Sequence, residues 1–285
     1  MITVCFPVYN GEKYISTALE YTIKQINNDN LNVRILISNN HSDDKTFEIC
    51  KDFAERYDCI KIFNQANKIS LIENYNFLLK KVETKYFVFH SHDDVRLDGF
   101  YVECFKFLEK QKNIVLCYTH AVYKDEITHK IYREEKCEKM GWGSSLNERF
   151  LNTLKNLETC AFHGMYRSAS VKKIGLMENI QGSDHFFLNK LSCEGKFFEI
   201  EKKLMMMNES SLKWKDGSIE NKLKINEIDK TSKYPLTRIF LSSLFYAFKK
   251  QKNKISNIKL GFLSLKVFFI FLKNDLLYKK FKSIF

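Results

Sequence analysis

Short apolar runs alternate with amphipathic stretches along the first part of the chain. Runs of strand length occur at residues 2–6, 33–38, 60–63 and 86–89. Between these runs, apolar residues recur every three or four positions, as in helices that bury one face. Such alternation predicts right-handed βαβ units and a mostly parallel sheet flanked by helices, an α/β fold. Polar loops follow the predicted strands, so we expect these loops to gather at one edge of the sheet.

Beyond Asp94 the alternation is less regular. The pattern predicts helices and strands in the following order: a helix at 99–108, a strand at 114–118, extended segments around 120–133, and helices at 146–157 and 168–174. A further helix opens with residues 181–188 and ends at 194–195, and a strand follows at 196–200.

Composition and charge divide the chain into two regions. With 285 residues and 45% hydrophobic residues, the chain can bury a large core. The net charge of +12 is concentrated in residues 233–285, which contain twelve Lys or Arg and one Asp, so residues 1–232 carry only +1. The sequence therefore predicts a near-neutral domain with a basic tail.

The eight cysteines are scattered and include no C-x-x-C pair. This spacing favours reduced thiols in a cytosolic protein over a disulfide framework or a zinc site. The first predicted strand begins at Ile2 with no basic segment before it, so no signal peptide is expected.

Two adjacent carboxylates follow the fourth predicted strand. The run Tyr86–Phe89 leads directly into His90-Ser91-His92-Asp93-Asp94. Open α/β sheets bind ligands at the carboxyl ends of their strands, and carboxylates with a diphosphate typically hold Mg²⁺ or Mn²⁺. Asp93 and Asp94 are thus the candidate metal ligands, with a solvated turn as the alternative.

Three motifs in series carry a family resemblance. Residues 4–11 (VCFPVYNG), 37–46 (ISNNHSDDKT) and 92–94 (HDD) resemble the successive motifs of family 2 glycosyltransferases. The resemblance covers roughly residues 1–215 and leaves residues 216–285 as a separate basic region. It implies the GT-A fold, a nucleotide-sugar donor, transfer with inversion and a divalent metal ion, Mg²⁺ or Mn²⁺.

The resemblance also assigns the donor site by position. The implied nucleotide-binding residues are Pro7, Val8, Tyr9, Asn10, Asn39, Asn76, His92 and Asp93. Asn39 departs from the usual aspartate; because an amide both donates and accepts, UDP is the first expectation and CDP is possible. Ser91 replaces a further aspartate of many members. The alternatives are strand-end packing for Tyr9, a turn or cap for Asn39, and a solvated helix face for Asn76.

A second acidic position lies at the start of a later predicted helix. The resemblance places Asp184 there as the general base that takes the proton of the acceptor hydroxyl. It also places His163, Gly164 and Ser183 around the sugar or acceptor pocket. The structural alternatives are an N-cap for Ser183 and Asp184, and a core or turn histidine for His163. Residues 208–215 fall where members carry a mobile loop.

The basic tail contains two apolar, aromatic segments, residues 236–248 and 258–272. Lysines interrupt them, so neither reaches the roughly 20 residues that span a bilayer. We expect helices that contact an anionic membrane surface, or that pack on the catalytic domain or in a homo-oligomer. Nucleic acid is not an expected partner, because no recognition motif is present.

These observations predict a metal-dependent, inverting transferase that moves a sugar to a saccharide or lipid-linked acceptor in surface glycan synthesis, such as lipopolysaccharide or capsule. Its expected location is the cytoplasmic face of the membrane. A nucleotidyltransferase is an alternative, although no glycine-rich, basic loop follows the first strand. A catalytically inactive glycosyltransferase-like binding protein is another, because of Asn39 and Ser91.

Overall fold

The computed structural model describes residues 1–137, 139–156, 158, 160–180, 182–209, 235–251, 259–261, 264–265 and 268–269. The strands are β1 (Ile2–Val8), β2 (Val33–Asn39), β3 (Ile60–Asn64), β4 (Tyr86–Phe89), β5 (Val95–Arg96), β6 (Ile114–Asp125), β7 (Ile131–Glu135), β8 (Met165–Arg167) and β9 (Lys196–Glu209). The helices are α1 (Ile15–Asn28), α2 (Thr46–Arg56), α3 (Leu71–Lys80), α4 (Phe100–Lys110), α5 (Leu146–Lys155), η1 (Cys160–His163), α6 (Ser168–Ile174), α7 (Ser183–Glu194) and α10 (Pro235–Lys250).

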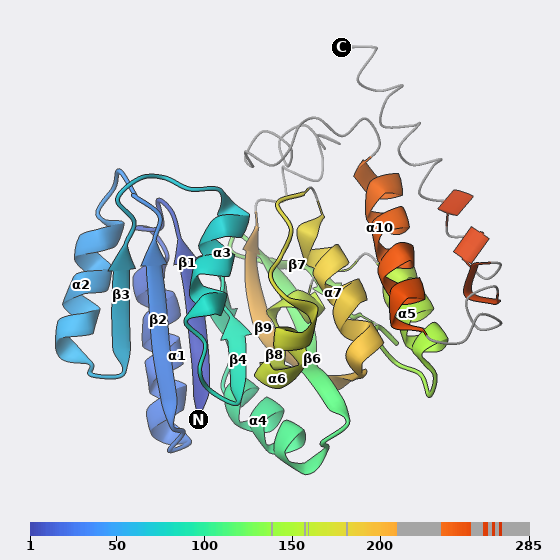
Figure 1. Cartoon of the computed structure of the whole chain (residues 1–285). Coiled ribbons are helices and arrows are strands. Elements are labelled where there is room, and N and C mark those ends of the chain that lie inside the picture. Colours follow the sequence, from blue (N-terminus) through green and yellow to red (C-terminus); the bar gives the residue numbers. More distant parts are fainter. Residues whose placement is uncertain are drawn as a thin grey trace.

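A single mixed sheet runs through the molecule (Figure 1). Its strand order is β3-β2-β1-β4-β8-β6-β9-β5, with β7 paired to β6. The predicted parallel arrangement is confirmed for β3, β2, β1 and β4. From β8 onward the pairing is mixed: β8 is antiparallel to both β4 and β6, whereas β9 is parallel to β6.

The register of the parallel strands brings their carboxyl ends to one level. Val8 lies across from Asn39, and Asn39 lies across from Asn64. Phe89 of β4 pairs with Cys5 of β1. The loops after β1, β2 and β4 therefore emerge at the same edge of the sheet, where such folds bind ligands.

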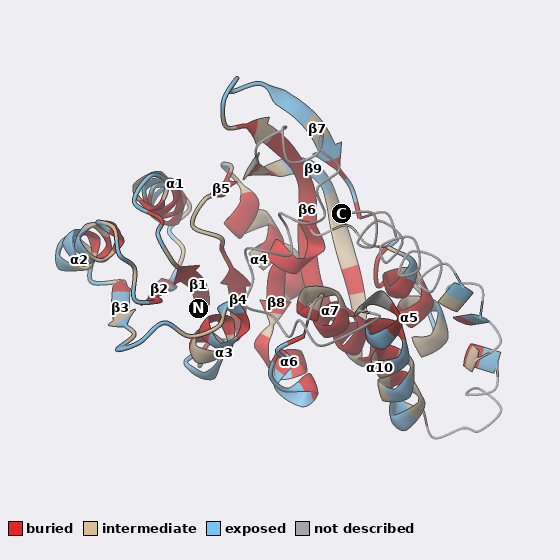
Figure 2. Cartoon of the chain, turned by 90° about the horizontal axis from the view of Figure 1, so that it is seen from above, coloured by how far each residue is buried: buried red, intermediate tan, exposed pale blue. Residues whose placement is uncertain are grey.

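Helices cover both faces of the sheet (Figure 2). Helices α1, α2 and α4 lie on one face, and α3, α6 and α7 lie on the other. Because both faces are covered, β1 and β4 are apolar and buried along their whole length. The continuous apolar runs in the sequence reflect this double burial.

The second half of the sheet is more extended than the sequence predicts. Strand β6 has twelve residues and β9 has fourteen, whereas apolar runs indicated only residues 114–118 and 196–200. Beyond these runs, polar residues such as His120 and Lys203 lie in the paired region. Asn208 and Glu209, expected in a mobile loop, belong to β9; residues 210–215 of that loop lie outside the described residues.

Helix α10 packs against α7 and α5. Ile239 and Phe240 are buried there, and the Asn189 amide donates a 3.1 Å hydrogen bond to the Ser243 hydroxyl. This face of α10 therefore packs on the domain. On the outer face, Leu241 and Phe245 are 52% and 72% exposed. The expected element at 258–272 falls mostly outside the described residues, as does the boundary at 215/216.

The helices in the described part of the chain are all too short or too polar to cross a bilayer.

Gly164 is required by packing between η1 and β6. A Cβ at this position would lie 2.6 Å from the Cys117 carbonyl oxygen and 2.8 Å from the Tyr118 Cβ. The close approach expected at Gly164 is therefore to a neighbouring strand, which differs from the predicted approach to a ligand.

We expect Gly164→Ala to lower the free energy of unfolding by about 1–3 kcal/mol, because backbone atoms cannot yield to the added methyl group. Urea denaturation measures this change. Gly175→Ala is the control: a Cβ added there would meet nothing within 4 Å, so only the positive φ of 78° opposes the change. Unchanged stability of Gly164→Ala would contradict the packing account.

Candidate active site

The loops after β1 and β2 are joined by backbone-to-side-chain hydrogen bonds. The Asn10 N–H donates to the Ser42 hydroxyl at 3.0 Å, and the Asp43 N–H donates to the Asn10 side-chain oxygen at 3.0 Å. The Glu12 N–H donates to the Asp44 carboxylate at 3.1 Å, which makes Asp44 a loop brace. These contacts confirm that the polar loops converge.

Tyr9 lies half-exposed at the end of this loop pair. Its hydroxyl donates to Asp43 at 3.3 Å, and the Lys68 ammonium lies 4.3 Å from the ring centroid. The ring therefore already stacks with a cation. A nucleotide base that stacked on this face would take the place of Lys68.

Asn39 and Asn76 both have their side-chain amides satisfied within the protein. Asn39 is buried, donates to Asn64 at 2.7 Å and accepts from the Ser42 hydroxyl at 2.6 Å. Asn76 donates to the Met177 carbonyl at 2.8 Å and accepts from the Met177 N–H at 2.9 Å. These hydrogen bonds use one N–H and one oxygen lone pair of each amide, so a contact with a base would have to use the remaining N–H or lone pair.

Pro7 and Val8 are buried within β1 and support the loop from below. The Val8 carbonyl accepts the Asn40 N–H at 2.8 Å. They differ from Tyr9 and Asn10, which reach the surface. The predicted nucleotide loop thus has two supporting residues and two accessible ones.

The acidic motif lies next to the first loop. His92 packs against Gly11, where a Cβ would lie 2.6 Å from the His92 ring. Asp93 is half-buried, and its carbonyl oxygen accepts a hydrogen bond from the Asn208 amide at the end of β9. Asp94 is buried with 4% exposure. The two carboxylates therefore lie at the junction of β1, β4 and β9.

Tyr75 of α3 links the acidic motif to Asp184. Burial raises the pKa of the Tyr75 phenol, a hydrogen bond with Ser91 opposes that rise, and Asp93, Asp94 and Asp184 each add to it through their charge. The charges of all three predicted carboxylates therefore influence the pKa of one hydroxyl group. The sequence marked Tyr75 only as an apolar position of a helix, because its spacing fits the buried face of α3.

Asp184 occupies the first turn of α7. The helix begins after Gly182, whose φ of 70° is in the left-handed region. The Ser183 hydroxyl donates to the Glu178 carbonyl at 2.6 Å, so Ser183 holds the helix start in place. The positive end of the helix dipole stabilises a carboxylate here.

Arg96 is a fully buried residue that connects two sides of the site. Its Nη2 donates to the Phe89 carbonyl at 3.3 Å and to the His163 carbonyl at 3.4 Å. Burial lowers the pKa of Arg96, and the nearby Asp94 raises it. Arg96 thus fixes the end of β4 to η1, and the sequence offered no signal for it.

His163 is buried at the end of η1, near Asp184. Burial, followed by the charge of Arg96, lowers the pKa of His163 to about 3. The imidazole is therefore neutral at neutral pH. It can donate or accept a hydrogen bond there, but it does not supply a positive charge.

This pKa predicts a loss of stability in acid. The unfolded chain protonates His163 near its ordinary pKa of 6.5, whereas the folded protein does not until about 3. Stability is therefore full above pH 6.5 and falls as the pH drops toward 3. Between pH 7.5 and 5 we expect this residue to lower the free energy of unfolding by about 2 kcal/mol.

Urea denaturation across that pH range measures the effect in wild type and in His163→Gln. The variant should show a shallower dependence on pH, whatever its overall stability. Equal slopes for the two proteins would contradict the assigned protonation state.

The carboxylate oxygens of Asp93 and Asp94 are ligands of the kind that a hard divalent cation binds. Carboxylate oxygens are the protein ligands of Mg²⁺ and Mn²⁺, which complete their shells with water and phosphate oxygens. The half-buried Asp93 and buried Asp94 lie together at the sheet edge with Asp184 nearby. These residues fit a metal-assisted transfer to a hydroxyl.

Comparison with known proteins identifies the family. The model of the family described as glycosyl transferase family 2 matches residues 3–175, more than half of the chain. The chain belongs to glycosyl transferase family 2. It is a glycosyltransferase, and the matched residues include the β1 and β2 loops, the acidic motif, His163 and Gly164.

The minor teichoic acid biosynthesis protein GgaB of Bacillus subtilis is one curated relative of this glycosyltransferase. The two are 29% identical over 111 residues, which is 39% of this chain and 12% of GgaB. The chain thus matches a small part of that larger protein.

Solved structures confirm the GT-A fold. TarS of S. aureus, residues 1–349 in complex with UDP, has a TM-score of 0.62 at 13% identity and covers 91% of this chain and 69% of its own. The mannosyltransferase PcManGT of Pyrobaculum calidifontis, in complex with GDP-Man and Mn²⁺, has a TM-score of 0.57 at 10% identity. It covers 93% of this chain and 70% of its own.

Proposed function

We propose that this glycosyltransferase uses a divalent metal ion and transfers a sugar from a nucleotide diphosphate, most readily UDP, with inversion at the anomeric carbon. The observation that carries the proposal is the position of the acidic motif: Asp93 and Asp94 follow β4 at the sheet edge where the loops after β1 and β2 meet. The charges of Asp93, Asp94 and Asp184 also raise the pKa of the buried Tyr75 phenol. A single-step displacement needs a metal site for the leaving group and a base for the incoming hydroxyl close together.

The chain's own residues divide this work. Asp184, in the first turn of α7, accepts the proton of the acceptor hydroxyl as that oxygen attacks the anomeric carbon. Asp93 and Asp94 would hold Mg²⁺ or Mn²⁺, and the ion would supply positive charge toward the departing diphosphate. Arg96 and Tyr75 keep the two halves of the site at a fixed separation.

The proposed donor nucleotide is UDP, with CDP as the second candidate. The support is a structural neighbour with bound UDP, and the presence of Tyr9 and Asn39 at the loops that the family resemblance implies. GDP-Man in the other neighbour makes GDP a necessary member of any test. The family assignment favours sugar transfer over the nucleotidyltransferase alternative.

A saccharide or lipid-linked acceptor in surface glycan synthesis is the proposed acceptor class. The teichoic acid relative supports this class over intracellular small-molecule acceptors. The basic tail and the exposed Leu241 and Phe245 support a place at an anionic membrane surface. The alternative is that Leu241 and Phe245 contact a second copy of the chain in a homo-oligomer.

A thermal-shift panel tests the donor site. UDP, CDP and GDP are each added with and without Mn²⁺ to wild type and to the variant with both Asp93→Ala and Asp94→Ala. A ligand that binds only the folded state stabilises it, so UDP should raise the Tm when Mn²⁺ is present and not in the variant. A response to GDP alone, or no response of wild type to any nucleotide, would contradict the proposed donor.

A further inference from the structure

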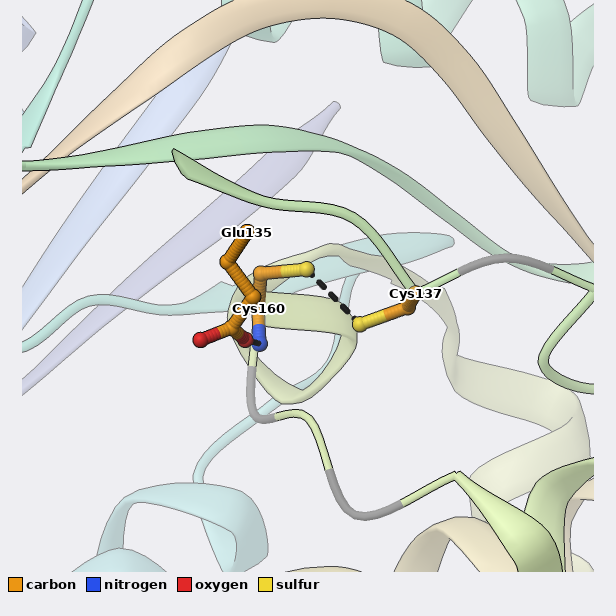
Figure 3. A group of neighbouring side chains, drawn as sticks. All are labelled: Glu135, Cys137 and Cys160. Atoms are coloured by element: carbon orange, nitrogen blue, oxygen red, sulfur yellow. Dashed lines mark hydrogen bonds between the residues drawn. The ribbon is translucent and has the colours of Figure 1, made fainter. Parts of the chain in front are cut away.

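Two thiols and a carboxylate meet away from the acidic motif (Figure 3). Glu135 ends β7, Cys137 follows it after one residue, and Cys160 begins η1. Their ligand atoms all lie within 4.8 Å of one another, and all three residues are buried. The two sulfur atoms are 2.7 Å apart. The sequence spacing gave no reason to expect this group, because β7 and η1 meet only in the fold.

We propose that Glu135, Cys137 and Cys160 bind a soft divalent cation of the Zn²⁺ class at a site separate from catalysis. A site that combines thiolates with a carboxylate or imidazole binds Zn²⁺ in preference to Mg²⁺ and Mn²⁺. Binding releases the two thiol protons, so that both sulfurs coordinate as thiolates.

Glu135 is held in place as a ligating carboxylate would be. Its Oε1 accepts the Cys160 N–H at 2.6 Å, its Oε2 accepts the Tyr123 hydroxyl at 2.5 Å, and Arg133 lies 3.2 Å from Oε2. With Glu158, which also hydrogen-bonds with Glu135, these contacts use about the four acceptor directions of a carboxylate, so a bound metal would take the place of one of them. Hydrogen bonds of this kind orient the ligands of known metal sites.

The surroundings are acidic. Glu158 hydrogen-bonds with Glu135, and Glu199 accepts the Cys137 N–H at 3.0 Å. Close-set carboxylates create the negative potential that attracts a dication. Glu158 and Glu199 are also candidates for the fourth ligand.

Burial favours a metal over an oxidation switch. Cysteines that sense oxidants are accessible, whereas Cys137 and Cys160 are both buried. Structural zinc sites, by contrast, are closed to solvent. Two sulfurs bound to a tetrahedral zinc lie roughly 3.8 Å apart. The thiols would therefore separate by about 1 Å on binding, a shift that side-chain rotation can supply.

A metal here would fasten β7 to η1, and η1 leads directly to His163 and Gly164. The helix α5 and the loops around it lie between the two cysteines in the chain. The site would thus stabilise the acceptor side of the fold without touching Asp93 or Asp94. It does not depend on the proposed donor or mechanism.

Zinc content of the full-length protein tests this site. The protein is produced with zinc in the medium and separated from unbound metal by gel filtration. Its metal content is then measured by inductively coupled plasma mass spectrometry. We expect about one zinc per chain, and at least a tenfold lower content in Cys137→Ser and in Cys160→Ser.

Two controls separate this site from others. Cys104→Ser should keep its zinc, because Cys104 forms a similar buried hydrogen-bonded pair with Cys117 elsewhere in the core. The variant with both Asp93→Ala and Asp94→Ala should also keep it. Loss of zinc in that variant and not in the cysteine variants would overturn the proposal by assigning the metal to the acidic motif.

Cobalt gives a test that does not require stable variants. Wild-type protein produced with Co²⁺ should show a thiolate-to-cobalt charge-transfer band in the near ultraviolet. Absence of both zinc and this band would overturn the proposal. So would an intact mass lower by two hydrogen atoms with Cys137 and Cys160 in one cross-linked peptide, because that result makes the pair a disulfide.

Discussion

Asp184→Asn should lower kcat roughly 10³-fold and leave the KM for the donor nearly unchanged. The amide keeps the size of the carboxylate but cannot take the proton of the acceptor hydroxyl, and general base catalysis typically contributes about 10²- to 10⁴-fold. The donor is held by other loops, so its binding should persist. The measurement is initial rates of nucleotide release at saturating acceptor, with donor concentration varied.

Glu48→Gln is the matched control for this substitution. Glu48 is the acidic residue in the first turn of α2, so its loss removes a similar helix-dipole interaction far from the base position. Both variants should unfold within about 1 kcal/mol of wild type, and only Asp184→Asn should lose turnover. A rate for Asp184→Asn within a few fold of wild type would exclude Asp184 as the base.

Removal of the metal site should have an equally large effect. With Asp93→Ala and Asp94→Ala together, we expect kcat/KM for the donor to fall at least about 10³-fold, because metal stabilisation of a leaving diphosphate is worth several kcal/mol. Treatment of wild type with a chelator should produce the same loss. The measurement is nucleotide release from the donor sugar under both conditions.

Metal add-back distinguishes this site from the proposed zinc site. Mn²⁺ or Mg²⁺ should restore the chelated wild type without added zinc, and should not restore the double variant. Full activity of the double variant, or recovery of the chelated enzyme with Zn²⁺ alone, would contradict the role of Asp93 and Asp94.

Much of the fold could be predicted from residues 1–94. Strands β1 and β4 are buried along their length because helices cover both faces of the sheet there, and α1 and α3 each bury an apolar stripe. The convergence of the loops after β1, β2 and β4 follows from parallel pairing alone. Loop contacts such as that between Asn10 and Ser42 confirm it.

The second half was less predictable because its strands are defined by long-range pairing. The distal parts of β6 and β9 form a ladder with each other, in which Met205, Met206 and Met207 lie across from Ala121, Val122 and Tyr123. The contact of α10 with α7 depends likewise on Ile239 meeting Ile180 and Phe186 across the fold. Local periodicity cannot identify such partners.

For the candidate site, the sequence identified residue types but not their surroundings. The roles of Asp93, Asp94 and Asp184 stay predictions, while Asn39 and Asn76 have internal hydrogen-bond partners that no motif indicates. Tyr75 and Arg96 had patterns of ordinary core or surface residues. Their places became visible only when α3, β5 and η1 were brought together.

The most direct test is a crystal structure with UDP and Mn²⁺, with anomalous scattering used to locate the metal. The account predicts one manganese peak within about 2.5 Å of an Asp93 or Asp94 carboxylate and of a diphosphate oxygen, with Asp184 facing the side open to the acceptor. A diphosphate bound with no metal contact to Asp93 or Asp94 would contradict it.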